Sequence, residues 1–330
     1  MSSGSARYVA LSGGIGGAKL SLGLARLLGE RLSVIVNTGD DFEHLGLAIS
    51  PDVDTTLYTL GGVVNAETGW GRAEETWSFM QATAELGGPT WFKLGDRDLA
   101  THVERTRRLA AGETLTGITQ YLAEKLGIAA RILPMADEPV RTVVESDGGT
   151  LAFQEYFVRD QCRPVARSIR YEGAAKARPT GAVIAALSDP RLAGIVICPS
   201  NPWLSVDPIL AVPGMREAMR ASGAPVIAVT PIIGGKAVKG PTAKIMGELG
   251  LVPTAAAIAR HYGTLLDGFV LDAQDEALAR EIGVATVVTG TMMRSLDDKV
   301  SLAEACLSFC DRLGKGGPAA ARREEIEAAP

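Results

Sequence analysis

The sequence has few cysteines and histidines for a zinc site, and it lacks the long apolar runs of membrane spans and export signals. Its four cysteines contain no CxxC pair, and its three histidines do not complete a zinc set with them. We interpret the cysteines as buried, reduced thiols, as in the reducing cytosol. No apolar run approaches the about 20 residues of a membrane span, and the first residues lack the apolar core of an export signal. We therefore expect a cytoplasmic protein with no membrane partner.

Neither sign of charge is in large excess. The formal net charge of the 330 residues is -5 and no long basic run occurs, so we expect no nucleic-acid partner. Small anions can still be bound by local loops and helix N-termini. The chain contains neither GxSxG nor a Ser–His–Asp order, which disfavours a covalent hydrolase. We interpret His102 and His261, which lie in helical patterns, as packing or surface residues.

Short apolar, β-branched runs bounded by Gly, Pro, Asn or Asp alternate with helical patterns along the chain. Continuous apolar runs are typical of strands that are buried on both faces. The alternation predicts an α/β protein with a doubly wound, mainly parallel, Rossmann-like sheet. The predicted strands cover residues 8–11, 32–38, 182–187, 194–200, 225–231, 268–273 and 285–290.

The middle of the chain has a different pattern. Residues 74–171 predict a mostly helical insertion with a β-hairpin, whose turn is the DGG of Asp147 to Gly149. The Rossmann-like core would then consist of residues 1–73 and 172–314. The Ala-rich residues 315–330 predict a flexible tail.

The segment SGGIGGAK, Ser12 to Lys19, follows the first predicted strand and precedes a helical pattern. This is the layout of a phosphate-binding loop, but it matches neither common fingerprint. Lys19 stands where a dinucleotide fingerprint needs its third Gly, and Ala18 stands where a P-loop needs Gly before its Lys. Since ligands of open α/β sheets bind at the carboxyl ends of strands, the polar segments that follow other strands should meet this loop.

A cluster of acids follows the second predicted strand in NTGDDFEHLGLAISPDVDTT. It contains Asp40, Asp41, Asp52 and Asp54, with Glu43 nearby. Carboxylates at a strand end beside a phosphate loop are a common way to hold Mg²⁺ against a phosphorylated substrate. The alternative for any one acid is turn formation or helix capping.

Three further polar segments carry candidate binding residues. In KLGDRD, Lys93 or Arg97 could reach a phosphate or an acidic group, or the segment is a solvated turn. In PSNP, Asn201 could bind a purine edge by paired hydrogen bonds, or it forms an Asn turn. The loop IIGGKAVKGPTAK could hold a diphosphate through its backbone N–H groups and lysines, or it is a flexible basic loop.

Taken together, SGGIGGAKL, VNTGDDFEHLGLAISPDVDTTLYTL, KLGDRDLATHVERT, PSNPWLSVDPIL and TPIIGGKAVKGPT resemble the 2-phospho-L-lactate transferases of coenzyme F-420 biosynthesis. The resemblance runs from about residue 7 to 312, with the motifs in order. ISPDVDT, KLGDRD and the GGKAVKGP loop are most similar to the actinobacterial branch, which transfers phosphoenolpyruvyl or phospholactyl groups to Fo.

The resemblance implies a Mg²⁺-dependent enzyme that is cytoplasmic and a homodimer. Its acceptor would be the 8-hydroxy-5-deazaflavin Fo, and its donor a guanosine diphosphate ester, either lactyl-2-diphospho-5'-guanosine or enolpyruvyl-2-diphospho-5'-guanosine. The terminal ribityl hydroxyl of Fo would attack the β-phosphorus and GMP would leave. The product would be F-420-0 or dehydro-F-420-0.

By the same resemblance, Asp54 and Lys93 match family positions that contact the deazaflavin. We expect Asp54 to bind metal or to accept the hydroxyl proton, with Asp40 as a second catalytic candidate and Asp40 and Asp41 as further metal ligands. The residues expected to hold the guanosine diphosphate moiety are Gly13, Gly14, Gly16, Gly17, Asn201, Gly234, Gly235 and Lys239.

Two alternatives remain open at this point. A subset of the same superfamily has a similar glycine loop and similar acids but binds nucleotide-sugars or dinucleotides in regulation of carbon metabolism; KLGDRD favours the transferase branch. An NAD-dependent oxidoreductase is the other alternative, with Asp40 as the ribose-binding acid. Lys19, at the position of the missing glycine, disfavours it.

Overall fold

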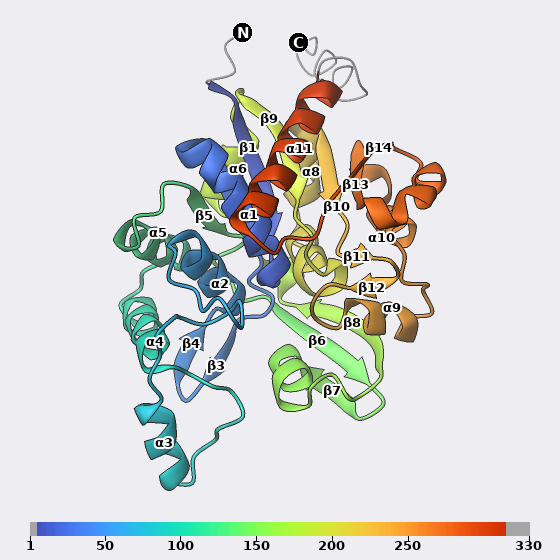
Figure 1. Ribbon diagram of the computed structural model, residues 1–330. Helices are drawn as coiled ribbons and strands as arrows, with labels where there is room; N and C mark the ends of the chain where they lie inside the picture. The colour runs from blue at the N-terminus through green and yellow to red at the C-terminus, as the bar shows by residue number, and fades with distance from the viewer. Residues whose placement is uncertain (1–4, 315–330) are drawn as a thin grey trace.

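A seven-stranded parallel sheet forms the centre of the protein in the computed structural model, which describes residues 5–314 (Figure 1). The strand order is β14-β13-β10-β9-β1-β2-β5, and each neighbouring pair is parallel. The chain therefore winds outward in both directions from β1, which confirms the predicted fold class. The strands are β1 (Arg7–Ser12), β2 (Leu32–Val36), β5 (Arg131–Pro134), β9 (Leu192–Ile197), β10 (Val226–Val229), β13 (Gly268–Asp272) and β14 (Ala285–Thr289).

Apolar side chains on both faces of the strands explain why this sheet is central. Val9 and Leu11 of β1 belong to the core on one face, and Tyr8 and Ala10 belong to the core on the other. This alternation follows from the two-residue repeat of a strand. Helices α1 (Gly14–Leu28) and α11 (Leu296–Gly314) cover the second face; the first is covered by α6 (Gly181–Leu187), α8 (Met215–Ala221) and α10 (Ala255–Tyr262).

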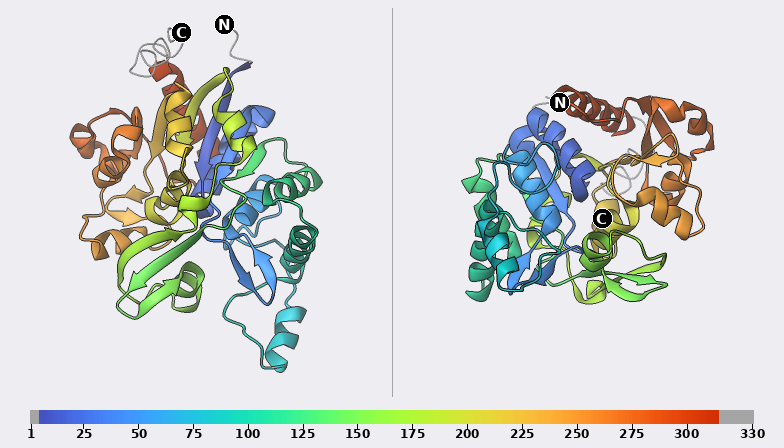
Figure 2. Two further views of the ribbon diagram at one scale, coloured as in Figure 1. Left: turned by 180° about the vertical axis from the view of Figure 1, so that it is seen from behind. Right: turned by 60° about the horizontal axis from the view of Figure 1, so that its bottom comes forward.

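The carboxyl ends of the strands point toward two lobes (Figures 1 and 2). One lobe contains the hairpin β3 (Phe42–His44) and β4 (Leu47–Ile49) with α2 (Pro51–Leu60), α3 (Ser78–Glu85), α4 (Asp96–Ala110) and α5 (Leu115–Lys125). The other is the antiparallel sheet of β6 (Arg141–Ser146), β7 (Gly149–Ala152) and β8 (Ala166–Glu172). The predicted hairpin is confirmed, since β6 and β7 close at the Ser146–Gly149 pair.

Smaller elements complete the chain. Past β10 lie the hairpin β11 (Ile232–Ile233) and β12 (Lys236–Ala237) and the helix α9 (Thr242–Glu248); α7 (Asp207–Leu210) follows β9. Short 3-10 helices lie at Gly29–Arg31, Ala174–Lys176, Gly263–Leu265 and Ala273–Glu281, and π-helical turns at Glu155–Arg159 and Pro202–Val206.

Two sequence predictions about the elements were wrong. Residues 182–187 form helix α6 and not a strand, because the side chain of Thr180 caps the helix by accepting a hydrogen bond from the Val183 N–H. A short apolar run by itself does not distinguish a buried helix from a strand. Residues 131–134, inside the predicted insertion 74–171, form edge strand β5 of the central sheet. The predicted insertion is therefore divided into two segments, one before β5 in the sequence and one after it. The predicted tail 315–330 lies outside the described residues.

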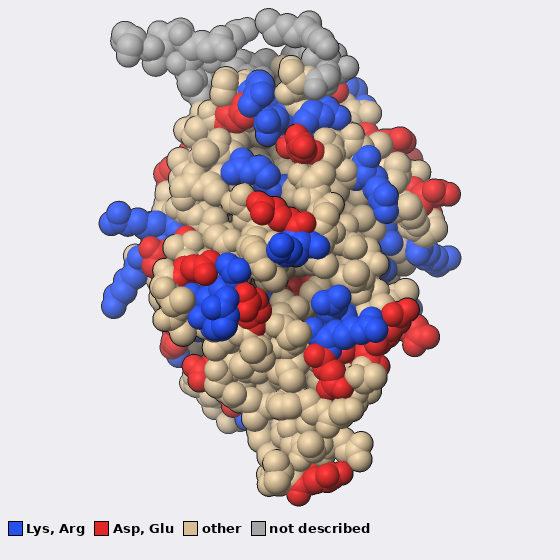
Figure 3. All heavy atoms as spheres, turned by 90° about the vertical axis from the view of Figure 1, so that its left-hand side faces the viewer, with Lys and Arg blue, Asp and Glu red and all other residues tan. Residues whose placement is uncertain are grey.

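The surface on the side of α4 and α5 carries interspersed basic and acidic side chains (Figure 3). No continuous basic area covers this face. Among residues 5–314, there is no helix with both the length and the apolar character needed to cross a membrane.

The contact of α1 with α11 leaves no room for a side chain at Gly23. A β-carbon there would lie 2.1 Å from the carbonyl oxygen of Lys299. We expect Gly23→Ala to lower the free energy of unfolding by about 1–3 kcal/mol, because the two helices would have to move apart. Chemical denaturation measures this change. Gly247→Ala, in open space within α9, is the matched control and should be neutral or stabilising; equal effects of the two variants would contradict the packing argument.

Candidate functional site

A cavity of about 770 Å³ lies where the predicted polar segments meet, and it opens between the two lobes. The lining includes the glycine loop, the acid cluster, PSNP and the GGKAVKG loop, which were all predicted to follow sheet strands. Thr291 and Met293, which follow β14, also line it. KLGDRD contributes as well. Of the residues predicted for the site, those in the lining are Gly13, Gly14, Gly16, Asp40, Asp54, Lys93, Asn201 and Lys239.

Four predicted residues do not line the cavity: Gly17, Asp41, Gly234 and Gly235. Gly234 and Gly235 form the turn between β11 and β12, where both adopt positive φ, which glycine tolerates best. Their role in the structure is therefore to turn the chain. Lys239 of the same loop does reach the cavity.

The glycine segment is the first turn of a helix and not a free loop, because α1 begins at Gly14. A β-carbon on Gly16 would lie 2.4 Å from the carbonyl oxygen of Pro199, and one on Gly17 would lie 2.5 Å from the Ser200 hydroxyl. These two glycines thus allow the PSNP segment to pack against the helix. Gly14 has a φ of 62°, so glycine is also favoured where strand β1 turns into α1.

Asp40 and Asp52 are buried carboxylates that line the cavity, and Asp52 contacts the glycine turn. Asp52 accepts hydrogen bonds from the Gly14 N–H at 2.7 Å and from the Asn37 side-chain amide at 2.9 Å. Oδ1 of Asp40 is buried without a hydrogen-bond partner among the described residues. Burial, and then the neighbouring charge of Asp52, hold the pKa of Asp40 well above its usual range. Burial also raises the pKa of Asp52.

Asp41 points away from the cavity and accepts a hydrogen bond from the Ser50 hydroxyl at 2.8 Å. Burial raises the pKa of Asp41 to about 7, although the bond from Ser50 works in the opposite direction. The position of Asp41 therefore does not fit the predicted role of a metal ligand in the cavity.

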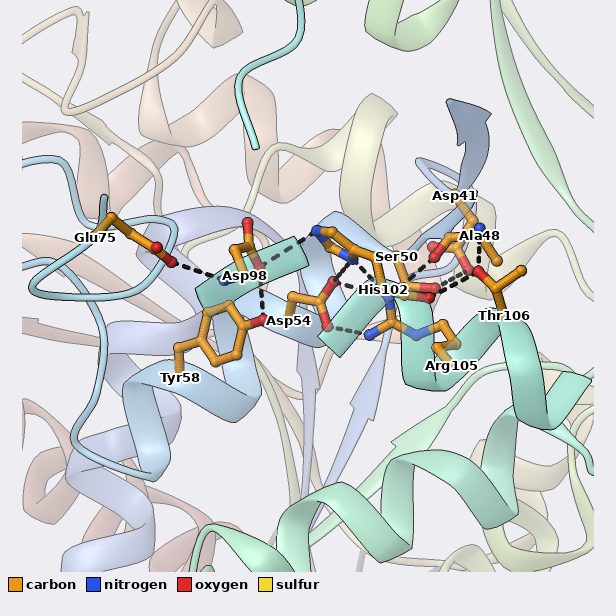
Figure 4. Close-up of polar contacts among 10 residues, drawn as sticks. All are labelled: Asp41, Ala48, Ser50, Asp54, Tyr58, Glu75, Asp98, His102, Arg105 and Thr106. Carbon is orange, nitrogen blue, oxygen red and sulfur yellow. Dashed lines mark hydrogen bonds and ion pairs between the residues drawn. The ribbon is translucent and has the colours of Figure 1, made fainter. Parts of the chain in front are cut away.

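Asp54 lines the cavity, but its carboxylate is already paired (Figure 4). Arg105 of α4 donates NH1 to Asp54 Oδ2 at 3.0 Å and NH2 to Oδ1. The Arg105 side chain is 1% exposed and also donates to the Ala48 carbonyl. With both oxygens bound to a guanidinium, Asp54 does not fit the predicted role of a metal ligand.

Sequence reasoning missed Arg105 and assigned His102 to packing or the surface. His102 instead lines the cavity, between Asp98 and the Asp54–Arg105 pair (Figure 4). One signal was available: Asp98, His102 and Arg105 are four and three residues apart, which places them on one face of a helix. Arg107, which is exposed, does not share this spacing, but the spacing alone does not show that the face with Arg105 is buried.

Among residues 5–314, no group of three or more His, Cys, Asp and Glu side chains is arranged to hold a metal ion. Mg²⁺ needs only one or two protein carboxylates, because waters and phosphate oxygens complete its shell. Asp40 and Asp52 fit this requirement, since both line the cavity and an oxygen of Asp40 is buried and unpartnered. The predicted set of Asp40, Asp41 and Asp54 does not.

Aromatic rings line the rest of the cavity. Trp91 and Phe92 lie on the side of α4, and Phe153 and Phe157 lie on the side of β7. Phe153 and Phe157 are stacked with ring centroids 5.3 Å apart. The cavity therefore combines apolar flat walls with a small number of charged groups, as is typical of sites for aromatic ligands.

Two lysines stand at the cavity beside the glycine turn. Lys19 donates to the Met293 carbonyl at 3.1 Å, and Lys239 donates to the Thr68 carbonyl at 3.0 Å. Burial, together with the charges of Lys239 and Lys299, lowers the pKa of Lys19. Positive charges held this close favour an anion between them.

A family model described as "2-phospho-L-lactate transferase CofD" matches residues 8–295. A Streptomyces griseus protein named phosphoenolpyruvate transferase is 42% identical over 317 residues, covering 93% of this chain and 99% of that protein. A Mycobacterium tuberculosis protein of the same name is 38% identical over 334 residues, with coverage of 93% and 99%. The crystal structure of Protein BH3568 from Bacillus halodurans superposes with a TM-score of 0.61 at 17% identity, covering 92% of this chain and 99% of that one, which shows likeness of fold alone.

The Asp54–Arg105 pair makes a prediction about stability. Arg105→Met leaves a buried carboxylate without its partner, which should lower the free energy of unfolding by about 3–5 kcal/mol. Adding Asp54→Asn to the same chain should restore much of the loss, because the carboxylate that lost its partner is then neutral. Arg107→Met, on the exposed face of the same helix, should cost less than about 1 kcal/mol. If Arg107→Met costs as much as Arg105→Met in chemical denaturation, the pair has no special role.

Asp41 makes a prediction about pH. In the folded chain its carboxyl keeps a proton up to about pH 7, whereas in the unfolded chain it loses the proton near its ordinary pKa of 3.8. The free energy of unfolding therefore falls between these values as pH rises. Asp41→Asn removes this pH dependence. As pH rises, the free energy of unfolding of the variant should therefore increase relative to the wild type, by up to about 1.4 kcal/mol per unit of difference between the folded and unfolded pKa. Denaturation in EDTA from pH 4 to 8 measures it, and a difference that does not change with pH would exclude the raised pKa.

Proposed function

Because the chain belongs to the 2-phospho-L-lactate transferase CofD family, we propose that it transfers a phosphoenolpyruvyl or phospholactyl group to the deazaflavin Fo. The donor is enolpyruvyl-2-diphospho-5'-guanosine or lactyl-2-diphospho-5'-guanosine, and the acceptor atom is the terminal ribityl hydroxyl. That oxygen bonds to the β-phosphorus, the bond from phosphorus to GMP breaks, and dehydro-F-420-0 or F-420-0 is formed. The name of the Streptomyces and Mycobacterium relatives favours the enolpyruvyl donor.

The observation that carries this proposal is the composition of the cavity. Flat aromatic walls, a buried pair of carboxylates and two lysines beside a helix N-terminus line one space of about 770 Å³. The aromatic walls suit a deazaflavin, and the carboxylate pair suits a metal-assisted phosphoryl transfer. The lysines and the helix N-terminus suit a diphosphate. No single group is specific, but a transfer from a nucleoside diphosphate ester to a tricyclic acceptor uses all three.

We assign the diphosphate of the donor to the glycine turn. The fifteen-residue helix α1 directs its positive end into the cavity at Gly14. Lys19 and Lys239, which are far apart in the sequence, line the same space. An anion between them would relieve the repulsion that helps to lower the pKa of Lys19. Asn201 accepts hydrogen bonds from the backbone N–H groups of Trp203 and Leu204, while its amide nitrogen has no partner among the described residues. That free donor is our candidate contact to the guanosine moiety.

Asp40 and Asp52 are the residues we assign to Mg²⁺. When bound, the cation would neutralise the charge on the phosphate oxygens. The carboxylate pair would be relieved of its mutual repulsion, which contributes to the raised pKa of Asp40.

Asp40 is also our candidate for the group that receives the hydroxyl proton. Asp40 lines the cavity, and one of its oxygens has no hydrogen-bond partner among the described residues. Asp54 is less suited to this role, because its two oxygens accept from Arg105. Three expectations stay predictions. They are the contact of Asp54 and Lys93 with the deazaflavin, the homodimer, and the absence of a nucleic-acid partner.

Mass spectrometry tests the proposal. Purified protein incubated with Fo and either donor in Mg²⁺ should give the mass of F-420-0 or of dehydro-F-420-0 together with GMP. Removing Mg²⁺ with EDTA should stop product formation, and adding it back should restore it, because the transferred phosphate would lose its neutralising charge. Product formed equally well in EDTA would contradict the metal assignment. Tight binding of a UDP-sugar with no product from either donor would favour a regulatory nucleotide-sugar binder instead.

A further inference from the structure

Asp98 of α4 is a carboxylate in the cavity wall whose two oxygens differ in their surroundings (Figure 4). Oδ1 accepts a hydrogen bond from the Tyr58 hydroxyl at 2.6 Å and lies 3.3 Å from His102 Nε2. In the part of the chain that the structure describes, no hydrogen bond to Oδ2 is made. The Asp98 side chain is 13% exposed, so the unbound oxygen belongs to a mostly buried group.

The neighbours of Asp98 fix which oxygen is free. Arg105 NH1 lies 3.2 Å from His102 Nδ1, and a guanidinium can only donate, so Nδ1 is the acceptor. An imidazole that accepts at Nδ1 carries its proton on Nε2, and Nε2 lies 3.3 Å from Asp98 Oδ1. Glu75 accepts from the Asp98 backbone N–H at 2.8 Å and holds the start of α4 in place. Oδ1 is thus held by Tyr58 and faced by the His102 donor, which leaves Oδ2 for another partner.

The same contacts keep Asp98 charged. Burial raises the pKa of a carboxyl, but the interactions with His102, Tyr58 and Arg105 outweigh it and hold the pKa of Asp98 below its usual range. Oδ2 is not among the buried side-chain atoms that lack a partner, so it is open to the cavity. A ligand that fills the cavity would exclude water from this charged oxygen, and a donor group on the ligand would replace the lost hydrogen bond.

The aromatic residues of this wall indicate what kind of ligand carries that donor. Three aromatic residues near Asp98 line the cavity. Trp91 and Phe92 precede it in the chain, and Tyr58 donates a hydrogen bond to it. Flat rings favour a flat ligand, and a flat heteroaromatic ligand presents its N–H and O–H donors at its edge.

We propose that Asp98 is a specificity-determining residue whose Oδ2 accepts a hydrogen bond from a ring N–H or ring hydroxyl of the acceptor substrate. The proposal rests on the proposed function, since it takes the acceptor to be a deazaflavin. Tyr58, His102 and Arg105 act through Asp98 as positioning residues: Tyr58 and His102 orient Oδ1, and Arg105 sets the His102 tautomer.

Asp98→Asn tests the proposal because it replaces one acceptor oxygen with a donor NH₂ group of similar size and removes the charge. Tyr58 donates to Oδ1 and His102 Nε2 lies 3.3 Å from it, so the amide oxygen of the asparagine should take the place of Oδ1 and its NH₂ group should turn toward the cavity. A ligand that donates a hydrogen bond would then meet a donor. A hydrogen bond to a charged group contributes enough that we expect the Kd for Fo to rise about tenfold to a hundredfold.

The measurement is titration of the metal-loaded full chain with Fo, followed by deazaflavin absorbance, and separately with GDP as a probe of the donor site. Asp98→Asn should weaken Fo binding and leave GDP binding unchanged. Tyr58→Phe should have a smaller effect on Fo, because it removes one of the two groups that orient Oδ1. Asp297→Asn, an exposed acid in the first turn of α11, is the matched control and should bind both ligands as the wild type does.

Three results would overturn the proposal. Fo binding unchanged in Asp98→Asn would remove Asp98 from acceptor recognition while the proposed function stands. An equal loss of Fo and GDP binding, or a lowered melting temperature that accounts for the loss, would give Asp98 a structural role only. Failure of the wild type to bind Fo while it binds GDP would contradict the proposed acceptor, and this inference with it.

Discussion

The buried ion pair between Asp54 and Arg105 is the interaction on which the α2–α4 wall of the cavity depends. It joins the first turn of α2 to the middle of α4, and through the Ala48 carbonyl it also reaches the β3–β4 hairpin. Removing two charges from water is expensive, so such a pair is a poor source of stability. It defines geometry instead, because a bidentate guanidinium accepts few arrangements of its partner. His102, Asp98 and Tyr58 take their positions from it in turn.

A second constraint is close backbone packing where β1 turns into α1. The Gly13 N–H donates a hydrogen bond to the Ser200 hydroxyl, and this hydroxyl donates one to the Gly13 carbonyl. Gly16 and Gly17 let the PSNP segment approach the helix to a distance that no side chain would allow. The glycines thus serve packing between protein segments as much as contact with a ligand. Their consequence for function is indirect: they fix the direction of α1, and with it the positive helix end at the cavity.

The sequence predicted the sheet and the gathering of its polar loops, because both follow from local rules. Continuous apolar runs require burial on two faces, and the carboxyl ends of parallel strands lie on the same edge. The prediction failed for residues 182–187, where the Thr180 hydroxyl caps a helix. It also failed for residues 131–134, a four-residue strand that ends in a proline and follows a helical region. Short segments carry too little periodicity to overrule their context.

For the site, the sequence by itself determined which chemical groups are present and near which strand ends they lie. It also carried the family, since motifs in a fixed order are a property of the chain alone. Only the tertiary structure decided which acids are free. Asp40, Asp41, Asp52 and Asp54 stand within fifteen residues, yet their surroundings differ. Asp40 has a buried oxygen without a partner, Asp41 accepts from Ser50, Asp52 accepts from the glycine turn and Asp54 is bound to Arg105. A carboxylate's role depends on partners distant in the chain, and the sequence does not show which they are.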